Sequence, residues 1–573
     1  MKRFFWILTG LALFFNLAAC AGTSAEGASV FTINGAAAAP DADGTIVISA
    51  GGAYELSGRL AGQIRVDAAG EDVTLVLNGA IIESVFSSAI FVEDADHVTI
   101  ELAEGSQNRL SDAAEYSYDD AAAEEPDGTI FSKANLVLQG SGSLAIEANH
   151  SYAIRGKDEL AIADGSYEIT SVDTAIRAND SVTISGGSLS ITAGNDGIRA
   201  SNDTDEALGW VLVSGGTVDI TAVRDGIQAE TNLTVTGGAI KIVTSGAASA
   251  DDASAKGLKA EADIAISGGE IALETADDGI HAGGNIAIAD GTIAISAGDD
   301  GMHADANLAI SGGSVAVAKS YEGIEGKTIE ISGGVIRVAA SDDGFNAGGG
   351  ADGSSFGRWG ANAFASGGDV SLEISGGYIV IDAQGDGVDS NGTLTISGGV
   401  TLVSGPTNDG NGAMDSGEGS AFTITGGVLI AAGSAGMAET PGEASTQNAI
   451  SVGVSGAAGA LISIADADGN VLYAFRPAKN YQNVLICAPE IETGGTYTVT
   501  VGGTAADLNE DGYQQAGSVS GGEAVGSATV GAYLSTIGDI AMGGFGGQGG
   551  MGGRNRQPGG QDDQIPAGQG PRN

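Results

Sequence analysis

Residues 277–313 read DDGIHAGGNIAIADGTIAISAGDDGMHADANLAISGG, and one short motif occurs twice within this stretch. The motif DDGIH at residues 277–281 returns as DDGMH at residues 299–303, which is 22 residues further along the chain. Self-similarity at a fixed period is the mark of a repeat protein, in which one structural unit is stacked many times. The stretch therefore predicts a fold built from units of about 22 residues.

The same unit continues in both directions, marked by an apolar residue that precedes Ser or Thr and two glycines. This corner occurs at Ile184, Val213, Val235, Ile266, Ile310, Ile331, Ile374, Ile396 and Ile424. A variant corner at residues 288–291 divides the longest interval, and residues 201–208, 246–255 and 348–368 are insertions that lengthen other intervals. The repeat therefore covers most of the chain.

Within one period, apolar residues alternate with small or polar ones, as in residues 286–288, 293–295 and 301–304. Alternation with a period of two is typical of β-strands, so each unit contains three short strands. The Gly-Gly and Asp-Gly pairs are expected to supply the positive φ angles of the turns. Three strands in about 22 residues predict an all-β parallel β-helix, since a propeller blade needs about 40 residues.

Equivalent residues of successive coils form columns about 4.8 Å apart in such a fold. One predicted column points inward and is apolar throughout: Ile130, Ile154, Ile176, Ile198, Ile227, Leu258, Ile280, Met302, Ile324, Phe345 and Val388. We expect this column to form the core of the β-helix.

Four regions are predicted along the chain: a signal segment at 1–20, the β-helix at 30–445, a second β region at 446–540 and a disordered Gly-rich tail at 541–573. Residues 44–110 contain less regular strands and are expected to form the first coils and a cap. Residues 446–540 lose the period but keep strands, which suits either a terminal β cap or a small sandwich-like module. The arginines of the tail could alternatively contact an anionic wall polymer.

The signal segment begins with Lys2 and Arg3, continues with an apolar run and ends in Leu17-Ala18-Ala19-Cys20. This tetrapeptide resembles a bacterial lipobox, so we expect lipidation of Cys20 and attachment to the extracellular face of the cell membrane. An ordinary signal peptide with a chance cysteine is the alternative. Only Cys487 would remain in the mature chain, so no intramolecular disulfide is expected. No second apolar run approaches the ~20 residues of a membrane span.

The composition is strongly acidic, with a formal net charge of -50 over 573 residues, but 42% of the residues are hydrophobic. That hydrophobic fraction, rich in Val and Ile, favours a folded protein over a disordered one. Nucleic acid is excluded as a partner because it is also a polyanion. We expect a monomer.

Two predicted columns near the coil turns carry carboxylates. The first contains Thr174, Asp196, Asp225, Lys256, Asp278, Asp300, Glu322, Asp343 and Asp386; the second contains Asp173, Asn195, Asp277, Asp299 and Asp342. Carboxylates about 5 Å apart repel, and calcium, which takes six to eight oxygen ligands, would remove that repulsion. The candidate metal ligands are Asp277, Asp278, Asp299, Asp300, Asp342, Asp343 and Asp386. The alternative is that Asp-Gly is turn chemistry, with the carboxylates in water.

A further column follows the inward one: Phe131, Arg155, Arg177, Arg199, Gln228, Lys259, His281, His303, Glu325, Asn346 and Asp389. Strand alternation is expected to expose it on one face, where a long polar stripe suits an extended polymer. The candidate carbohydrate-binding residues are Arg177, Arg199, Lys259, His281 and His303. A merely solvated surface is the alternative, and His281 with His303 as a zinc site is a weaker one.

Several segments give the chain a family resemblance: VTLVLNG at 73–79, IFSK at 130–133, GDGVDSNG at 385–392, VSGPTNDGNGAMD at 403–415 and the insertion at 348–368. With the Asp-Gly-Ile coils, these resemble secreted bacterial carbohydrate-binding proteins with a calcium-binding right-handed parallel β-helix, related in fold to pectate lyases. The resemblance spans roughly residues 30–531. It implies calcium held by coil aspartates and binding of plant-wall or acidic polysaccharide. Lys256 departs from the pattern where aspartate is expected.

The leading expectation is therefore non-catalytic, calcium-dependent binding of a cellulose-like or polygalacturonate-like polysaccharide at the bacterial cell surface. A polysaccharide lyase is the first alternative, with calcium acidifying the substrate proton and Lys256, Lys259 or Arg224 as the base. A structural surface adhesin is the second.

Overall fold

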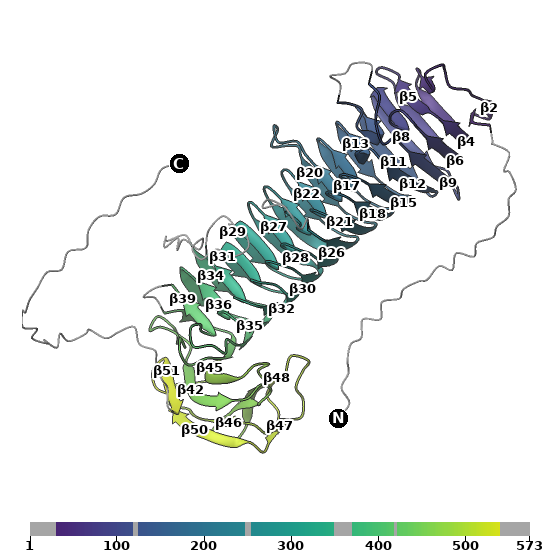
Figure 1. The fold of residues 1–573 in the computed structure, drawn as a ribbon. Helices are drawn as coiled ribbons and strands as arrows, with labels where there is room; N and C mark the ends of the chain where they lie inside the picture. The colour runs from purple at the N-terminus through teal and green to yellow at the C-terminus, as the bar shows by residue number, and fades with distance from the viewer. Residues whose placement is uncertain (1–29, 119–123, 247–253, 349–369, 418–420, 539–573) are drawn as a thin grey trace, which may run out of the picture.

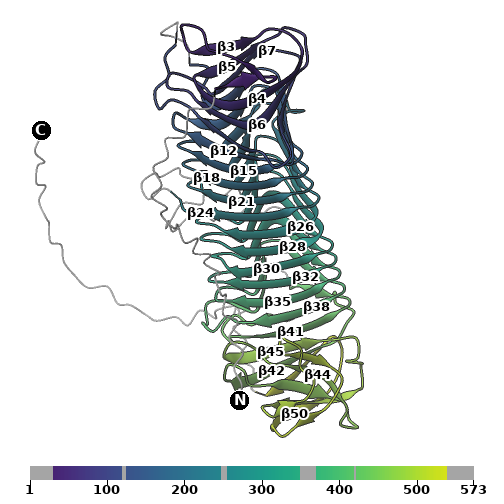
Figure 2. The ribbon, with the colours of Figure 1, turned by 90° about the vertical axis from the view of Figure 1, so that its right-hand side faces the viewer.

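The computed structural model describes residues 30–118, 124–246, 254–348, 370–417 and 421–538. These residues form an elongated rod of β-strands with a smaller β module at the C-terminal end (Figures 1 and 2). The predicted signal segment with Cys20 and the predicted tail at 541–573 lie outside the described residues. No helix in the described ranges has the length and apolar character required to cross a membrane.

The rod is a parallel β-helix with three strands in each coil, which confirms the predicted architecture. Three stacks of parallel strands run along it, and each strand pairs with its equivalent in the next coil.

The first stack positions the candidate site. It contains β3 (Thr45–Ile48), β5 (Gln63–Asp67), β7 (Ile90–Asp94), β10 (Gly128–Ser132), β13 (Tyr152–Gly156), β16 (Ile176–Ala178), β19 (Ile198–Ala200), β22 (Ile227–Ala229), β25 (Leu258–Ala260), β27 (Ile280–Ala282), the first residues of β29 (Met302–Ile310) and β31 (Ile324–Ile331), β33 (Phe345–Ala347), β36 (Val388–Ser390) and β39 (Met414–Ser416).

The second stack holds the predicted corners. It contains parts of β4 (Gly52–Ala61) and β6 (Val73–Glu83), β8 (His97–Leu102), β11 (Asn135–Gly140), β14 (Glu159–Ile162), β17 (Ser181–Ile184), β20 (Trp210–Val213), β23 (Leu233–Val235), parts of β26 (Ile264–Glu274) and β28 (Ile286–Ser296), the ends of β29 and β31, β34 (Ser371–Ile374), β37 (Thr393–Ile396) and β40 (Thr423–Ile424).

The third stack closes each coil. It contains the ends of β4, β6, β26 and β28 with β9 (Gln107–Ser111), β12 (Ser143–Ala148), β15 (Ser166–Ser171), β18 (Ser188–Ala193), β21 (Thr217–Ala222), β24 (Ala239–Thr244), β30 (Ser314–Lys319), β32 (Val335–Ala340), β35 (Tyr378–Ala383), β38 (Val400–Ser404) and β41 (Val428–Gly433).

The predicted register is confirmed residue by residue. In the first stack, Ile280 pairs with Met302, which pairs with Ile324, and all three side chains are fully buried. The corner residues pair in the same way along the second stack, for example Ile310 with Ile331. Aliphatic side chains from all three stacks form one continuous core along the β-helix.

The glycines of the Asp-Gly-Ile motif have a different role from the predicted one. The second glycine of each Gly-Gly corner does adopt positive φ, as at Gly313 (φ 78°). Gly279 and its equivalents do not. A Cβ atom on Gly279 would instead lie 2.5 Å from the Ile295 side chain and 2.6 Å from the carbonyl oxygen of Gly301 in the next coil. Close stacking of coils, not turn geometry, requires these glycines.

Residues beyond the last coil form a separate β module with its own apolar core. The end strand β41 pairs antiparallel with β45 (Tyr481–Cys487), which pairs with β42 (Ala449–Gly456), and β42 pairs with β51 (Leu534–Gly538). A second layer has the strand order β48 (Tyr513–Gln515), β44 (Val471–Phe475), β43 (Ile462–Ala465), β46 (Thr496–Val501) and β50 (Glu523–Thr529). A short pair, β47 (Thr504–Ala505) with β49 (Val519–Ser520), lies beside it.

The module is attached along the side of the last coils as well as at their end. Leu402 of β38 is buried in the module's apolar core, and Tyr378 of β35 packs against it. Arg337 of β32 donates hydrogen bonds to both carboxylate oxygens of Asp511 at 2.8 and 3.0 Å. At the N-terminal end, β1 (Thr32–Ile33) pairs with β2 (Ala36–Ala37) and with β4.

We predict that Gly279→Ala lowers the free energy of unfolding by about 1–3 kcal/mol, because the added methyl group must displace a backbone carbonyl and a core side chain. Urea unfolding followed by circular dichroism measures the change. The control is Gly531→Ala, which has open space around the position and no positive φ, and should stay within about 0.5 kcal/mol of wild type. Equal midpoints for the two variants would contradict the packing argument.

Candidate functional site

One column of side chains on the first stack changes from basic to acidic along the rod, and we call it the charged column. Its members pair in register from coil to coil: Arg155, Arg177, Arg199, Gln228, Lys259, His281, His303, Glu325, Asn346, Asp389 and Asp415. The five residues that the sequence marked for carbohydrate binding therefore lie in one line. Whether they bind carbohydrate stays a prediction.

The expectation that this column is exposed was wrong. Arg155, Gln228, His303 and Asn346 are buried, and the other members of the column are half-buried. Side chains only about 4.8 Å apart cover one another. The His281 and His303 rings, for example, stack with centroids 5.0 Å apart. Sequence alternation identified the direction of these side chains but not the cover that their neighbours provide.

Beside the charged column runs a column of carboxylates, which we call the acid ladder: Asp196, Asp225, Asp278, Asp300 and Glu322, which are buried, and Asp343 and Asp386, which are half-buried. Several of these carboxylates accept a hydrogen bond from the backbone N–H of the equivalent residue in the next coil. The distance is 2.8 Å from Lys256 N to Asp225, 3.1 Å from Asp300 N to Asp278 and 3.2 Å from Glu322 N to Asp300. The ladder thus has a structural role that sequence analysis missed, since it satisfies buried amides.

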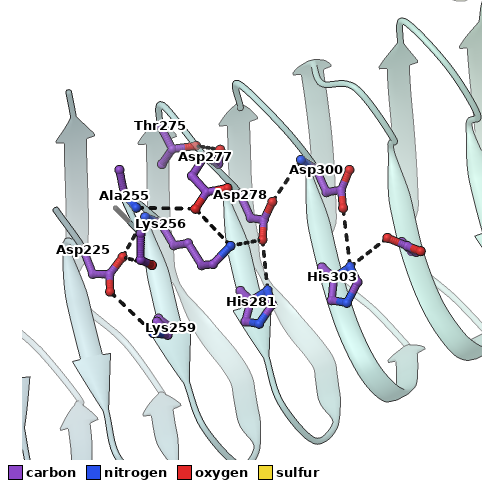
Figure 3. A network of polar contacts seen from close by, with 12 residues as sticks. Asp225, Ala255, Lys256, Lys259, Thr275, Asp277, Asp278, His281, Asp300 and His303 are labelled. Carbon is purple, nitrogen blue, oxygen red and sulfur yellow. Dashed lines mark hydrogen bonds and ion pairs between the residues drawn. The ribbon is translucent and has the colours of Figure 1, made fainter. Parts of the chain in front are cut away.

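Lys256 occupies the acid-ladder position in its own coil, and its charge neutralises the carboxylates of the next coil (Figure 3). Its Nζ atom lies 2.5 Å from Asp278 Oδ2 and 3.1 Å from Asp277 Oδ2. His281 Nδ1 donates to the same Asp278 oxygen at 2.9 Å. Burial opposes ionisation of Asp278, but the hydrogen bond from His281 and the charge of Lys256 outweigh it and hold its pKa well below the usual range. Asp278 is therefore a fully paired carboxylate.

His303 supplies the next internal cation. Only 1% of this residue is exposed, and its Nδ1 lies 2.7 Å from Glu325 Oε2 and 3.4 Å from Asp300 Oδ2, while its Nε2 lies 3.1 Å from Asp305 Oδ1. Burial alone would lower the pKa of His303, but hydrogen bonds to these three carboxylates raise it. A doubly protonated imidazolium is the state that this arrangement favours.

Further along the rod the carboxylates have no such cation. Burial, reinforced by neighbouring carboxylates, raises the pKa of Asp343 and of Asp389 to about 8 and that of Asp386 to about 7. Glu439, from outside the repeats, has a pKa raised to about 7, again mainly by burial. Within the described parts of the chain, no Lys, Arg or His makes an ion pair with these four residues. Among the described residues, no positively charged side chain therefore offsets their mutual repulsion.

At this end of the rod, two of the carboxylates approach the same glycine. A Cβ atom on Gly385 would overlap one carboxylate oxygen each of Asp342 and Asp343, so the two oxygens converge over a residue without a side chain. Oxygen-only donors suit calcium. Of the predicted ligands, Asp342 and Asp343 direct oxygens toward Gly385, whereas Asp277, Asp278 and Asp299 bring carboxylate oxygens within 4.8 Å of one another. In that second group Lys256 already pairs with Asp277 and Asp278, and His303 lies beside Asp300 in the next coil.

Some residues of this cluster carried a sequence signal that was not used. Asp389 and Asp415 follow the inward Val388 and Met414, so the repeat alone placed them beside the acid ladder. Glu439 carried none, because it reaches the cluster from a non-repetitive segment. It accepts a 2.7 Å hydrogen bond from Ser416, the residue after Asp415.

The fold and these columns define an acidic parallel β-helix with charged side chains aligned on one strand stack. Residues 42–301, less than half of the chain, match a family model described as "Carbohydrate-binding domain-containing protein". The matched residues include Lys256 and the basic half of the charged column. They end before Asp343, Asp386 and Asp389.

Two individual proteins are similar over part of the chain. A carbohydrate-binding domain-containing protein of Acetivibrio thermocellus is 34% identical over 126 residues, which are 22% of this chain and 44% of that relative. The present chain thus spans less than half of the relative's length. A solved structure of a polysaccharide lyase-like protein from C. thermocellum, a gadolinium derivative, is 34% identical over 35% of this chain and 82% of its own. Its TM-score of 0.35 supports no argument about this molecule.

We predict that Lys256→Met destabilises the protein by about 3–5 kcal/mol, because it leaves the buried Asp278 without its cation. The matched control is Lys241→Met, which breaks a pair with Asp219 in which the side chains are 61% and 48% exposed. That change should cost at most about 1 kcal/mol. Thermal unfolding of both variants measures the difference, and similar losses in the two would mean that Lys256 is not the counter-ion of the buried carboxylate.

Proposed function

We propose that the protein binds polysaccharide along the charged column of the β-helix. The observation that carries this proposal is the match of residues 42–301 to a carbohydrate-binding family, on coils that present one continuous line of polar side chains. The coil repeat of about 4.8 Å offers an extended polymer many similar contacts in a row. Binding without catalysis is the form of the activity that we favour.

We further propose that binding depends on calcium held by Asp342, Asp343 and Asp386, with Asp389 beside them. The support is the convergence of oxygens over Gly385 and the absence of an internal cation there among the described residues. A bound calcium ion would neutralise these carboxylates and offer open coordination positions to sugar oxygens. Such an ion would also reconcile the net charge of -50 with an acidic polymer.

Attachment to the cell surface through a lipid on Cys20 is part of the same proposal. Its support is the apolar N-terminal run followed by Leu-Ala-Ala-Cys. A tethered rod would hold its binding face away from the membrane and toward insoluble polymer.

The lyase alternative receives little support from the best-placed lysine. A general base must be able to lose its proton near neutral pH. Burial favours the neutral amine of Lys256, but the charges of Asp278 and Asp277 outweigh it and raise its pKa. Lys259 is also paired, at 3.1 Å from Glu261 and 3.8 Å from Asp225.

We predict that chelation lowers the Tm of the wild type and releases it from polygalacturonate. Saturation at a hundred times the Kd contributes about 2.7 kcal/mol, so the shift is measurable by calorimetry with and without calcium. Asp343→Asn with Asp386→Asn should abolish the calcium-dependent part of both effects. Asparagine keeps an oxygen that can accept the ladder hydrogen bond, so the fold should persist.

The matched control is Asp278→Asn with Asp300→Asn, where Lys256 and His303 already supply positive charge. This variant should keep its response to calcium, although its stability falls. A wild type that ignores chelator would refute the calcium proposal alone. A wild type retained by neither cellulose nor polygalacturonate, with calcium present, would refute polysaccharide binding itself.

We predict that a bacterial host incorporates labelled fatty acid into the wild type and not into Cys20→Ala. The thioether to lipid requires the cysteine thiol, so the variant should appear in the medium. Cys487→Ala is the control, and it should label as the wild type does. Labelling of Cys20→Ala, or equal release of the wild type and this variant, would contradict the tether.

A further inference from the structure

We propose that Arg155 and Arg177, with Tyr152, form a subsite for an anionic group of the polysaccharide, specifically the carboxylate of an acidic sugar. This inference rests on the proposed polysaccharide binding and names the chemistry recognised at one part of the charged column. It concerns the basic half of the rod, far along the chain from the unpaired aspartates.

The two arginines come from adjacent coils and share one aromatic ring. Arg155 of β13 pairs directly with Arg177 of β16 in the parallel register. The guanidinium carbons lie 5.8 Å (Arg155) and 5.3 Å (Arg177) from the ring centre of Tyr152. Arg177 Nη1 donates to the Tyr152 hydroxyl at 2.6 Å. The tyrosine therefore holds two like charges side by side on one face.

Neither arginine forms an ion pair with a described residue, although the protein carries 50 more negative than positive charges. Within the described ranges no carboxylate oxygen lies within 4.0 Å of either guanidinium. Other arginines are paired, as Arg109 is with Glu147 at 2.7 Å and Arg199 with Asp196 at 3.4 Å. Arg155 and Arg177 are distinguished by lying side by side in adjacent coils.

The hydrogen bonding of Arg155 is incomplete as well. This residue is only 5% exposed; its Nη1 and Nη2 donate to the carbonyl oxygen of Gly156 and to Asn179 Oδ1, both at 2.8 Å. Its Nε atom is buried without an acceptor. Burial, together with the nearby charge of Arg177, lowers the pKa of Arg155. An anion beside the pair would relieve this repulsion.

One carboxylate, Asp127, acts electrostatically on both arginines but does not neutralise them. Burial raises the pKa of Asp127, and its Oδ1 atom has no hydrogen-bond partner. The neighbouring Lys157 is already paired with Glu125. Among the described residues, Asp127 and the Lys157-paired Glu125 thus leave the two arginines with an excess of positive charge, which an anionic group could neutralise.

The chemistry favours a carboxylate on a sugar. A guanidinium presents parallel N–H groups that match a carboxylate in a bidentate contact. Tyr152 and Arg177 are half-buried, so each keeps a surface that a ligand can reach. Arg199, in the coil that follows, is held by Asp196 and lies 3.7 Å from Glu230, which ends the subsite at that level.

Calorimetric titration of the full mature chain with an oligogalacturonate, and with the methyl ester of the same oligosaccharide, tests the subsite. The titrations are run with chelator present so that calcium contributes nothing. The wild type should bind the free acid at least about tenfold more tightly than the ester, since one charge-assisted contact changes affinity by that order. Arg177→Gln should lose that preference and leave the weak affinity for the ester unchanged.

Arg109→Gln is the matched control, because it removes an arginine from another strand stack, and it should retain the wild-type preference. Equal affinity of the wild type for acid and ester would overturn the subsite and leave polysaccharide binding standing. A loss in Arg177→Gln that is equal for acid and ester would also overturn it, since it would reflect altered structure. Failure of every polysaccharide to bind the wild type, with or without calcium, would overturn both proposals.

Discussion

The interaction on which the whole rod depends is the hydrogen bonding between adjacent coils at a separation of about 4.8 Å. That separation decides what can occupy each column. An apolar column such as Ile280–Met302–Ile324 becomes a continuous core, and a glycine column is required wherever the next coil's carbonyl approaches too closely for a Cβ atom. The same separation forces charged residues into direct contact with their equivalents above and below.

The acid ladder illustrates how a repeat fold tolerates that contact. Most of its carboxylates accept a hydrogen bond from a backbone amide of the next coil, which offsets part of their lost hydration. In the middle of the rod, Lys256 and His303 provide the remaining compensation from within the chain. Toward the C-terminal end no described residue supplies such a cation, and burial raises the pKa values of Asp343, Asp386 and Asp389. The same coil geometry thus holds carboxylates that are paired with a cation and, among the described residues, carboxylates that are not.

Periodicity predicted the fold in detail because the sequence repeat and the strand register of a β-helix have the same spacing. Ile280 and Met302 are 22 residues apart in the sequence and pair directly in the structure. Periodicity also placed Arg177, Arg199, Lys259, His281 and His303 in one line. Periodicity did not predict their burial, because that depends on neighbouring side chains covering one another. Periodicity also did not predict that Arg155 and Arg177 both contact Tyr152, because that contact depends on the length and conformation of the side chains. It did not predict that Glu439 lies near the aspartates, because Glu439 belongs to a non-repetitive segment.

The antiparallel pairing of β41 with β45 has a consequence for the molecule as a particle. A β-helix that simply stopped would present unpaired strand edges to solvent, and such edges template the addition of further strands. Because β45 runs against the direction of the stack, it occupies the hydrogen-bonding groups of β41 and offers no surface on which another parallel coil could be laid. The third stack therefore ends at β45, and the number of coils that this stack can hold is set by the sequence itself.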